Sequence, residues 1–109
     1  MNRHEAIFAD RHAVVTGASR GIGSTIAAAL VARGARVSLL GRDAENLTTV
    51  SKALGGTSRA VPIAADVTEP DSISAAFTTA RQHFGPVHIL INNAGQAASA
   101  KFTETDETL

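Results

Sequence analysis

Three glycines are spaced in a way that could bind an anion. Gly17, Gly21 and Gly23 form the pattern G-x-x-x-G-x-G, between an apolar run and an amphipathic one. Gly17 can adopt backbone angles that a side chain forbids. Gly21 lets a bulky ligand approach the main chain, and Gly23 lets a helix pack closely on the preceding strand. The free N–H groups of that helix would then attract an anion, above all a pyrophosphate. A tight turn that binds nothing is the alternative.

A second candidate position lies about 20 residues further on, where dinucleotide sites carry an acidic residue for the ribose hydroxyls of NAD. Gly41 stands there, and Arg42 follows it. Arg20, in the glycine turn, is expected within reach of the same spot. Guanidinium groups without a carboxylate favour a 2′-phosphate, which predicts NADP (NADPH) rather than NAD. The alternative for Arg42 is a solvated turn residue.

Alternating apolar and amphipathic segments surround these residues. Apolar runs predict buried parallel strands at Ala13–Thr16, Arg36–Leu40, Ala60–Ala65 and Val87–Ile91. Amphipathic segments predict helices from about Arg20 to Arg33, from Asp43 to Leu54, from a capping-box-like start at Thr68 to Gly85, and from Thr103. The inner stripe of the first helix is expected to be Ile22, Ile26 and Leu30. Residues 1–11 are expected to form a leader with little structure.

This order of elements predicts the fold class. A β-α-β-α-β-α-β pattern without a linker predicts one α/β domain over residues 1–109, with helices covering a parallel sheet. Right-handed crossovers and a strand order of 3-2-1-4 would place the first two helices on one face and the third on the other. This is the N-terminal part of a doubly wound Rossmann fold. Pro62 cannot donate to a strand ladder, which predicts an edge position for the third strand. The fourth strand would form the other, open edge.

Composition argues against several classes of function. The chain has 109 residues and no cysteine, which excludes disulfides and thiolate chemistry. Its 10 basic and 10 acidic residues cancel, so neither nucleic acid nor a membrane surface is expected as a partner. No apolar run is long enough for a membrane span or a signal peptide, and a cytoplasmic location is expected. No metal site is predicted, because no metal-ligand spacing links His4, His12, His83 and His88.

Four segments carry a family resemblance, in order along the chain. They are Thr16-Gly17-Ala18-Ser19-Arg20-Gly21-Ile22-Gly23, Gly41-Arg42, Asp66-Val67-Thr68 and Asn92-Asn93-Ala94-Gly95. The sequence resembles the short-chain dehydrogenase/reductase family from about Arg11 to its end. Its glycine turn and arginine resemble those of NADP-dependent 3-oxoacyl reductases. The resemblance implies that Gly17, Ser19, Arg20, Gly21, Ile22 and Gly23 contact a nicotinamide dinucleotide, with Ser19 as a donor to a phosphate.

The resemblance also implies roles at the ends of the third and fourth strands. The Asp66 carboxylate would accept from the adenine amino group, and the Val67 main chain would meet the ring edge. Ligands of open α/β sheets bind at the carboxyl ends of parallel strands, where Asp66 lies. The alternative is that Asp66 caps a backbone turn, although Thr68 is the better cap candidate. Asn92 would tie neighbouring strands together. The residues implied to face the cofactor are Asn93, Ala94 and Gly95.

The residues for the family's chemistry are not found in this sequence. The resemblance implies hydride transfer between NADP(H) and a carbonyl or alcohol, with a tyrosine as acid and a lysine four residues later. The chain has no tyrosine, and its lysines are Lys52 and Lys101. Ser99 precedes the position of the family's serine. We therefore predict no catalytic residue here and expect a cofactor-binding fragment, truncated before the catalytic half of a protein that is homo-oligomeric at full length.

Two alternatives to a reductase fragment remain. The chain could be a non-catalytic NADP-binding module, or an inactive truncated remnant that folds poorly because its fourth strand lacks a neighbour. A cooperative thermal transition that NADPH shifts is expected only of a folded binder.

Overall fold

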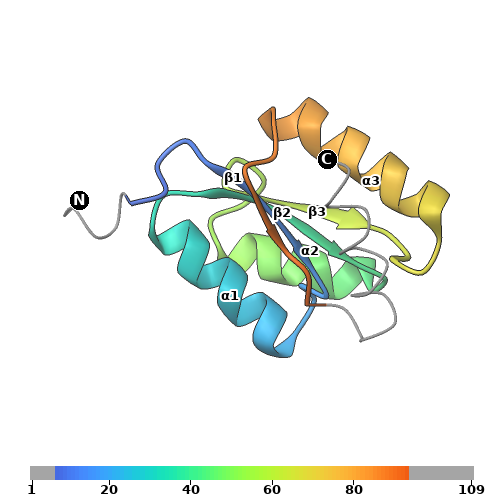
Figure 1. The fold of residues 1–109 in the computed structure, drawn as a ribbon. Coiled ribbons are helices and arrows are strands. Elements are labelled where there is room, and N and C mark those ends of the chain that lie inside the picture. The colour runs from blue at the N-terminus through green and yellow to red at the C-terminus, as the bar shows by residue number, and fades with distance from the viewer. Residues whose placement is uncertain (1–6, 94–109) are drawn as a thin grey trace.

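A parallel sheet of four strands lies between two layers of helices in the computed structural model, which describes residues 7–93 (Figure 1). The elements are β1 (His12–Thr16), α1 (Gly21–Ala32), β2 (Arg36–Gly41), α2 (Ala44–Ala53), β3 (Ala60–Ala64), α3 (Pro70–Phe84) and β4 (Ile89–Ile91). Their types and order are those predicted. Of the proposed elements and site residues, Ala94, Gly95 and the helix from Thr103 lie outside the described residues.

The strand order is β3-β2-β1-β4, as predicted, and all neighbouring strands run parallel. Pro62 lies in β3, which forms one edge of the sheet. An edge strand has no outer neighbour, so the missing N–H group of Pro62 leaves no hydrogen bond unmade on that side. β4 forms the other edge and is half-buried along its length. It pairs with β1 at three positions, Ala13 with Ile89, Val14 with Leu90 and Val15 with Ile91.

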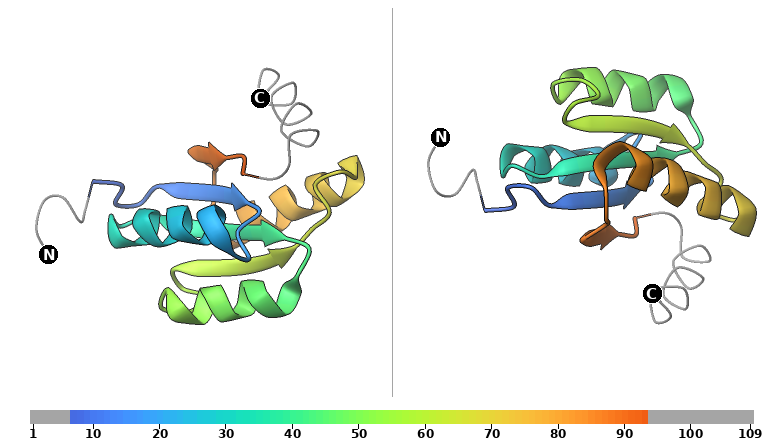
Figure 2. Two further views of the ribbon diagram at one scale, coloured as in Figure 1. Left: turned by 90° about the horizontal axis from the view of Figure 1, so that it is seen from below. Right: turned by 90° about the horizontal axis from the view of Figure 1, so that it is seen from above.

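Two separate clusters of buried side chains hold the layers together. α1 and α2 cover one face of the sheet, where Ala27, Leu30 and Leu47 pack against the strands. α3 covers the other face through Ala76 and Ala80. Figure 2 shows α1 and α2 on one side of the sheet and α3 on the opposite side. The predicted distribution of helices is confirmed, because right-handed crossovers force it once the strand order reverses after β3.

The predicted inner stripe of α1 is wrong at its first position. Ile22 is 71% exposed, and the buried residues of α1 are Gly23, Ala27 and Leu30. The rotation of the helix about its axis is determined by Gly23, whose Cα must face the carbonyl group of Gly17. Ile22 precedes Gly23 by about 100° of helical turn, so it points away from the sheet.

Part of the expected leader is folded onto the domain. Phe8 packs against the cluster beneath α1 and α2, and its amide donates to the carbonyl oxygen of Arg33 across 2.8 Å. The expectation of little structure is therefore wrong for residues 7–11, because the Phe8 side chain becomes partly buried next to the end of α1. Residues 1–6 lie outside the described part of the chain. Within residues 7–93, no helix has the length and apolar character needed to cross a membrane.

Candidate functional site

The glycine turn joins the end of β1 to the start of α1. Gly17 has a φ of +62°, which side chains rarely adopt, and its neighbour Ala18 is fully buried. A Cβ atom at Gly23 would overlap the carbonyl oxygen of Gly17 and crowd the side-chain nitrogen Nδ2 of Asn93 at 2.8 Å. The close packing predicted for Gly23 is thus present. It brings the first turn of α1 directly against the end of β1.

The first turn of α1 is open to an anion. A Cβ atom at Gly21 would meet no atom within 4 Å in the described chain. Arg20 is the N-cap residue but makes no side-chain cap, and no acidic residue occupies the first turn. The N–H groups at this end therefore lack the side-chain acceptor that usually satisfies them. Ser19 lies half-buried in the same turn.

The other two described helices differ from α1 at this end. Asp43 caps α2 by accepting from the amide of Asn46 across 3.1 Å, and Glu45 lies in the first turn. In α3, Pro70 removes one free N–H group and Asp71 supplies a negative charge. Among the three helices, α1 alone presents its positive end without an acidic side chain, and it does so beside an open glycine.

A hydrogen-bonded cluster joins the glycine turn to the end of β4. The Thr16 hydroxyl accepts from the main-chain amide of Asn93 at 2.8 Å and lies 3.2 Å from Oδ1 of Asn92, to which it donates. The side-chain amide of Asn93 donates to the carbonyl oxygen of Gly17 at 3.4 Å. Asn92 thus ties β4 to β1, as predicted. Asn93, predicted to face the cofactor, uses its side chain to hold the turn.

Thr16 is the site residue that sequence reasoning passed over. It belongs to the glycine motif, whose spacing assigns it no role of its own. Thr16 is fully buried at the last position of β1. The three residues before it are apolar, and the strand begins with His12. A hydroxyl in that place requires partners, and this is the signal that could have pointed to it.

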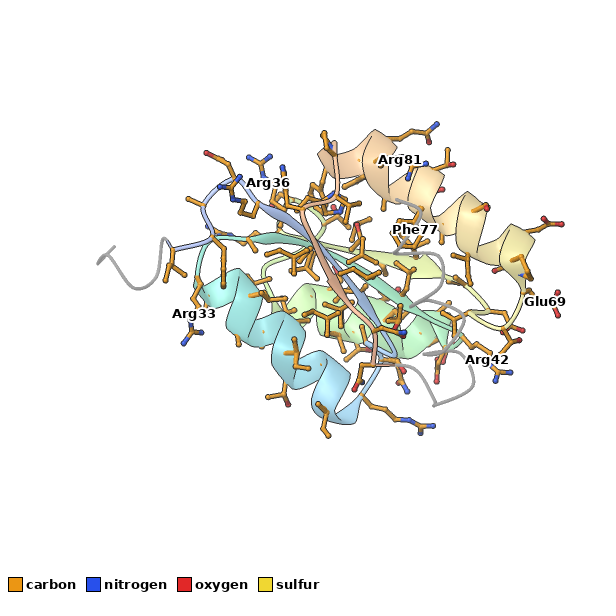
Figure 3. The ribbon with its side chains drawn as sticks, viewed as in Figure 1. Arg33, Arg36, Arg42, Glu69, Phe77 and Arg81 are labelled. Atoms are coloured by element: carbon orange, nitrogen blue, oxygen red, sulfur yellow. The ribbon has the colours of Figure 1, made fainter. Side chains whose placement is uncertain are left out.

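Arg42 lies at the carboxyl end of β2, where the sequence predicts a 2′-phosphate site. Arg42 follows the buried Gly41 and is exposed, and Figure 3 shows it at the opposite end of the sheet from Arg36. Arg20 is exposed as well. Within residues 7–93, neither Arg20 nor Arg42 forms an ion pair or a side-chain hydrogen bond. Both guanidinium groups are therefore available to a ligand.

Asp66 caps a turn at the end of β3. Its Oδ1 accepts from the Thr68 amide at 2.9 Å and from the Thr68 hydroxyl at 2.6 Å. These two bonds, and more weakly the charge of Arg42, lower the pKa of Asp66 below its usual value. The carboxylate therefore stays negative beside Arg42. The turn-capping alternative describes this contact of Asp66, and its role toward adenine remains a prediction.

The predicted cap at Thr68 is wrong. The N-cap residue of α3 is Glu69, which makes no side-chain cap, and Pro70 follows it. Thr68 lies one residue before the N-cap, and its hydroxyl donates to Asp66, whose ionised carboxylate is a strong acceptor. Asp66 is further held by its own amide, which donates to the Ser72 hydroxyl at 2.9 Å. Val67 lies half-buried between these contacts.

Comparison with known proteins places this geometry in a family. The family model described as short chain dehydrogenase matches residues 11–109. An uncharacterized oxidoreductase of Staphylococcus aureus strain USA300 is 42% identical over 98 residues, which are 90% of this chain and 42% of that protein. An uncharacterized oxidoreductase of Staphylococcus saprophyticus is 39% identical over 99 residues, with 89% of this chain and 42% of the relative covered.

A solved structure shares the fold as well. The crystal structure of glucose dehydrogenase of Caenorhabditis elegans in the apo-form matches with a TM-score of 0.75 and 34% sequence identity. The match covers 88% of this chain and 42% of that one. The chain thus spans less than half the length of the proteins it matches. The family model, these relatives and the shared fold together show that the chain belongs to the short-chain dehydrogenase family.

Proposed function

We propose that this chain binds NADP(H) in preference to NAD(H), as the cofactor-binding part of an oxidoreductase acting on a carbonyl or alcohol substrate. The observation that carries the proposal is the uncapped first turn of α1 behind an open Gly21. Such a turn fits a pyrophosphate because its N–H groups point outward and its dipole favours negative charge. Family membership supports the same ligand, since the relatives compared above are named as oxidoreductases and a dehydrogenase.

Arg42 and Arg20 support the preference for NADP(H). In NAD-binding sites of this kind, a carboxylate binds the 2′-hydroxyl of the ribose. Gly41 stands at that position here, so no carboxylate is present. A charge-assisted hydrogen bond contributes about 1.5–3 kcal/mol, so each arginine that bonds the 2′-phosphate would favour NADP by about tenfold to a hundredfold. The charges of Asp66 and Arg42 interact, which supports a site for adenine next to the proposed 2′-phosphate site.

The residues of this chain would bind and orient the dinucleotide. When bound, the nicotinamide supplies or accepts the hydride. The first turn of α1 and Ser19 would hold the pyrophosphate, Arg20 and Arg42 the 2′-phosphate, and Asp66 with Val67 the adenine. Asn93 would keep the turn in place from β4, with Ala94 and Gly95 following toward the cofactor. No tyrosine is present to move a proton, so we propose that these 109 residues bind without turnover.

Thermal denaturation of the chain with added dinucleotide tests the proposal. A ligand that binds only the folded state raises the melting temperature in proportion to the logarithm of its concentration above Kd. We expect a cooperative transition that NADPH shifts upward, and NADH shifts less at equal concentration. Adenosine 2′,5′-bisphosphate should shift it as well, because it carries the 2′-phosphate. A cooperative transition that no dinucleotide moves would contradict the proposed binding, and equal shifts by NADPH and NADH would contradict the preference.

A further inference from the structure

An open hollow lies at the amino-terminal end of the sheet, opposite the glycine turn. It has a volume of about 320 Å³, and its lining includes Asp10, Arg36, Ser58 and Arg59. Asp10 precedes β1, Arg36 begins β2, and Ser58 and Arg59 precede β3. Segments that are distant in the sequence thus supply the polar groups of this hollow, and two of those groups are guanidinium ions.

The two arginines stand side by side at the start of neighbouring strands. Arg36 and Arg59 directly precede Val37 and Ala60, which are partners in the parallel register of β2 and β3. The carbonyl oxygen of Arg59 accepts from the amide of Val37 at 2.8 Å, which holds the two main chains together. Like charges on adjacent strands repel each other. An anion between the two guanidinium groups would remove this repulsion.

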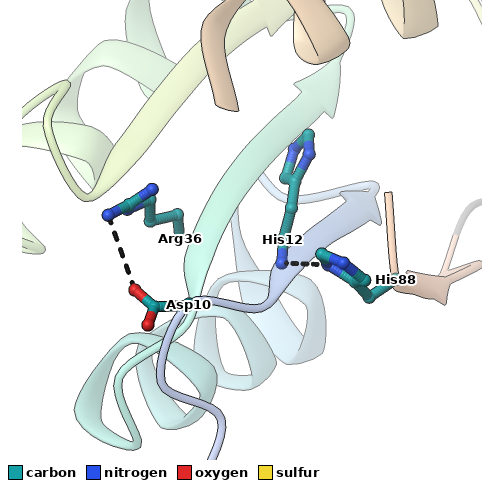
Figure 4. Close-up of polar contacts among 4 residues, drawn as sticks. All are labelled: Asp10, His12, Arg36 and His88. Carbon is teal, nitrogen blue, oxygen red and sulfur yellow. Dashed lines mark hydrogen bonds and ion pairs between the residues drawn. The ribbon is translucent and has the colours of Figure 1, made fainter. Parts of the chain in front are cut away.

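Asp10 offsets this positive charge only weakly. Its carboxylate lies 3.7 Å from the Arg36 guanidinium, which is longer than a hydrogen bond, and the two side chains are 90% and 51% exposed. Figure 4 shows this contact, together with the one in which the main-chain amide of His12 donates to Nδ1 of His88 at 3.0 Å. Water screens an ion pair as open as that of Asp10 and Arg36, so it contributes little stability. An anion can therefore displace the Asp10 carboxylate easily.

Arg59 and Ser58 bring hydrogen-bond donors to the hollow. Within residues 7–93, neither side chain forms a hydrogen bond or an ion pair. The stem of Arg59 packs on the turn after α2, since a Cβ atom at Gly55 would lie only 3.1 Å from Cδ of Arg59. A packed stem has less conformational freedom to lose when its guanidinium group binds a ligand.

The charge distribution of the molecule attracts anions to this end. Among residues 7–93, six of the eight Lys and Arg side chains lie at the amino-terminal end of the sheet, against Asp10 as one of six Asp and Glu side chains. The basic residues are Arg11, Arg33, Arg36, Lys52, Arg59 and Arg81. The C-terminal ends of α1, α2 and α3 also lie here, but each carries only about −0.5 of a charge. They offset less than half of the positive surplus, so this end stays positive.

We propose that the hollow binds a small molecule through a phosphate group, with Arg36 and Arg59 as guanidinium partners and the Ser58 hydroxyl as a further donor. A phosphate monoester carries about −1.5 to −2 charges at about pH 7, which matches two guanidinium groups better than a single carboxylate does. Planar guanidinium groups also bond phosphate oxygens in pairs. Asp10 pairs with Arg36 until the phosphate displaces it. The site is independent of the function proposed above, because the glycine turn lies at the other end of the sheet.

NMR titration of the isotope-labelled 109-residue chain with inorganic phosphate tests the site. The amides of Arg36, Ser58 and Arg59 report on the hollow, and the amides of residues 21–23 report on the glycine turn. Sodium chloride keeps the ionic strength constant, so that screening does not change during the titration. We expect saturable shifts at the hollow, with half-saturation at roughly millimolar phosphate. These shifts should persist when NADPH is present in excess.

Three variants of exposed residues test the individual roles. Arg36→Gln and Arg59→Gln each remove one guanidinium group, so the affinity of the hollow for phosphate should fall by at least about tenfold. Asp10→Asn removes the carboxylate that competes with the ligand, so the affinity should rise by about two- to fivefold. Unchanged shifts in the rest of the spectrum show that each variant is folded.

Two further variants control for the change in net charge. Arg33→Gln removes a positive charge from the same end of the molecule, but Arg33 donates to the Ala29 carbonyl oxygen at 3.1 Å and points away from Arg36 in Figure 3. Glu69→Gln removes a negative charge, as Asp10→Asn does, at the opposite end of the sheet. Both controls should leave the affinity of the hollow for phosphate within about twofold, because exposed charges at a distance are screened.

The outcomes distinguish a defined site from a diffuse positive surface. Saturable shifts that occur only at residues 21–23, or at no amide, would overturn the proposed site. Equal losses of affinity in Arg33→Gln and Arg36→Gln would also overturn it, because the net charge alone would then attract phosphate. Failure of NADPH to shift the amides of residues 21–23 would refute the function proposed above and leave the phosphate result at the hollow unaffected.

Discussion

The main-chain amide of Asn93 donates to the hydroxyl of Thr16 across 2.8 Å, which joins the end of β4 to the last residue of β1. The same hydroxyl lies 3.2 Å from Oδ1 of Asn92, and the Asn93 side chain reaches the carbonyl oxygen of Gly17. One buried hydroxyl thus bonds to the two residues that follow the edge strand and holds the base of the glycine turn. The shape of the candidate pyrophosphate site depends on this link between strands 77 residues apart in sequence.

Replacing Thr16 with valine tests the importance of this hydroxyl. Valine keeps the shape of the side chain but leaves the Asn93 amide without its acceptor. We expect the free energy of unfolding to fall by about 1–3 kcal/mol, the cost of an unsatisfied buried polar group. Denaturant unfolding monitored by circular dichroism measures the change. Thr48→Val is the matched control, because the Thr48 hydroxyl bonds to the Ala44 carbonyl on the exposed face of α2. Equal losses in both variants would refute the assignment.

Gly23→Ala tests the contact between helix and strand. The added methyl group would overlap the carbonyl oxygen of Gly17, a main-chain atom that can move only if the turn moves. We expect a loss of about 3 kcal/mol in the free energy of unfolding, as for an overpacked core. Thermal denaturation provides the measurement. A variant as stable as the wild type would show that α1 can shift away from β1 at little cost.

Gly21→Ala separates ligand space from folding. No described atom lies within 4 Å of the added methyl group, so the cost to the fold is the positive φ of +62°, about 1–2 kcal/mol. The methyl group would project into the space proposed for the pyrophosphate. NADPH affinity, measured by calorimetry, should fall by at least tenfold in a chain that still unfolds cooperatively. Unchanged NADPH affinity would show that the dinucleotide does not bind against this turn.

Arg42→Ala tests the choice between the two dinucleotides. Loss of a guanidinium group that bonds the 2′-phosphate should weaken NADPH binding by about tenfold or more and leave NADH binding nearly unchanged. Titration calorimetry with both ligands gives the ratio. Arg59→Ala, an exposed arginine just before β3 at the far end of the sheet, is the control and should alter neither affinity. Similar losses for NADPH and NADH in Arg42→Ala would contradict the assignment.

Asp66→Asn tests the charged turn after β3. The two bonds from Thr68 and the charge of Arg42 lower the pKa of Asp66 from 3.8, so the folded chain holds its proton less tightly than the unfolded chain does. Stability from this group is therefore present above about pH 4 and is lost as the pH falls through the lowered pKa. Asparagine can accept from the Thr68 amide without titrating. The stability difference between wild type and variant should shrink as the pH is lowered from about 6 to 3.

The outcome at Asp66 follows from the wild-type minus variant difference at each pH, because other carboxylates contribute equally to both curves. A difference that stays constant through this range would show that the turn does not depend on the charge of Asp66. Binding of NADPH by the same variant addresses the separate proposal that Asp66 accepts from adenine. A variant that binds NADPH with wild-type affinity would restrict Asp66 to capping its turn.

Sequence reasoning was most accurate where a local pattern leaves one arrangement. Pro62 cannot donate to an outer neighbour, and the strand order places it at an edge. Gly23 was predicted to allow close packing, and the carbonyl group of Gly17 occupies the space that a side chain would need. The prediction for Ile22 was wrong, because it rested on helical periodicity alone, which suggested a buried position. Periodicity identifies an apolar face, but the contact at Gly23 determines which way that face turns.

The sequence by itself determined the order of strands and helices, the place of the glycine turn and the absence of a carboxylate at Gly41, because each depends on residues close together in the chain. Only the tertiary structure decided the partners of Thr16, Asn93, His12 and His88, since these residues meet through pairing of β1 with β4. Hydrogen bonds between distant segments leave no periodic trace in sequence. They exist because buried donors and acceptors must find partners once the strands are brought together.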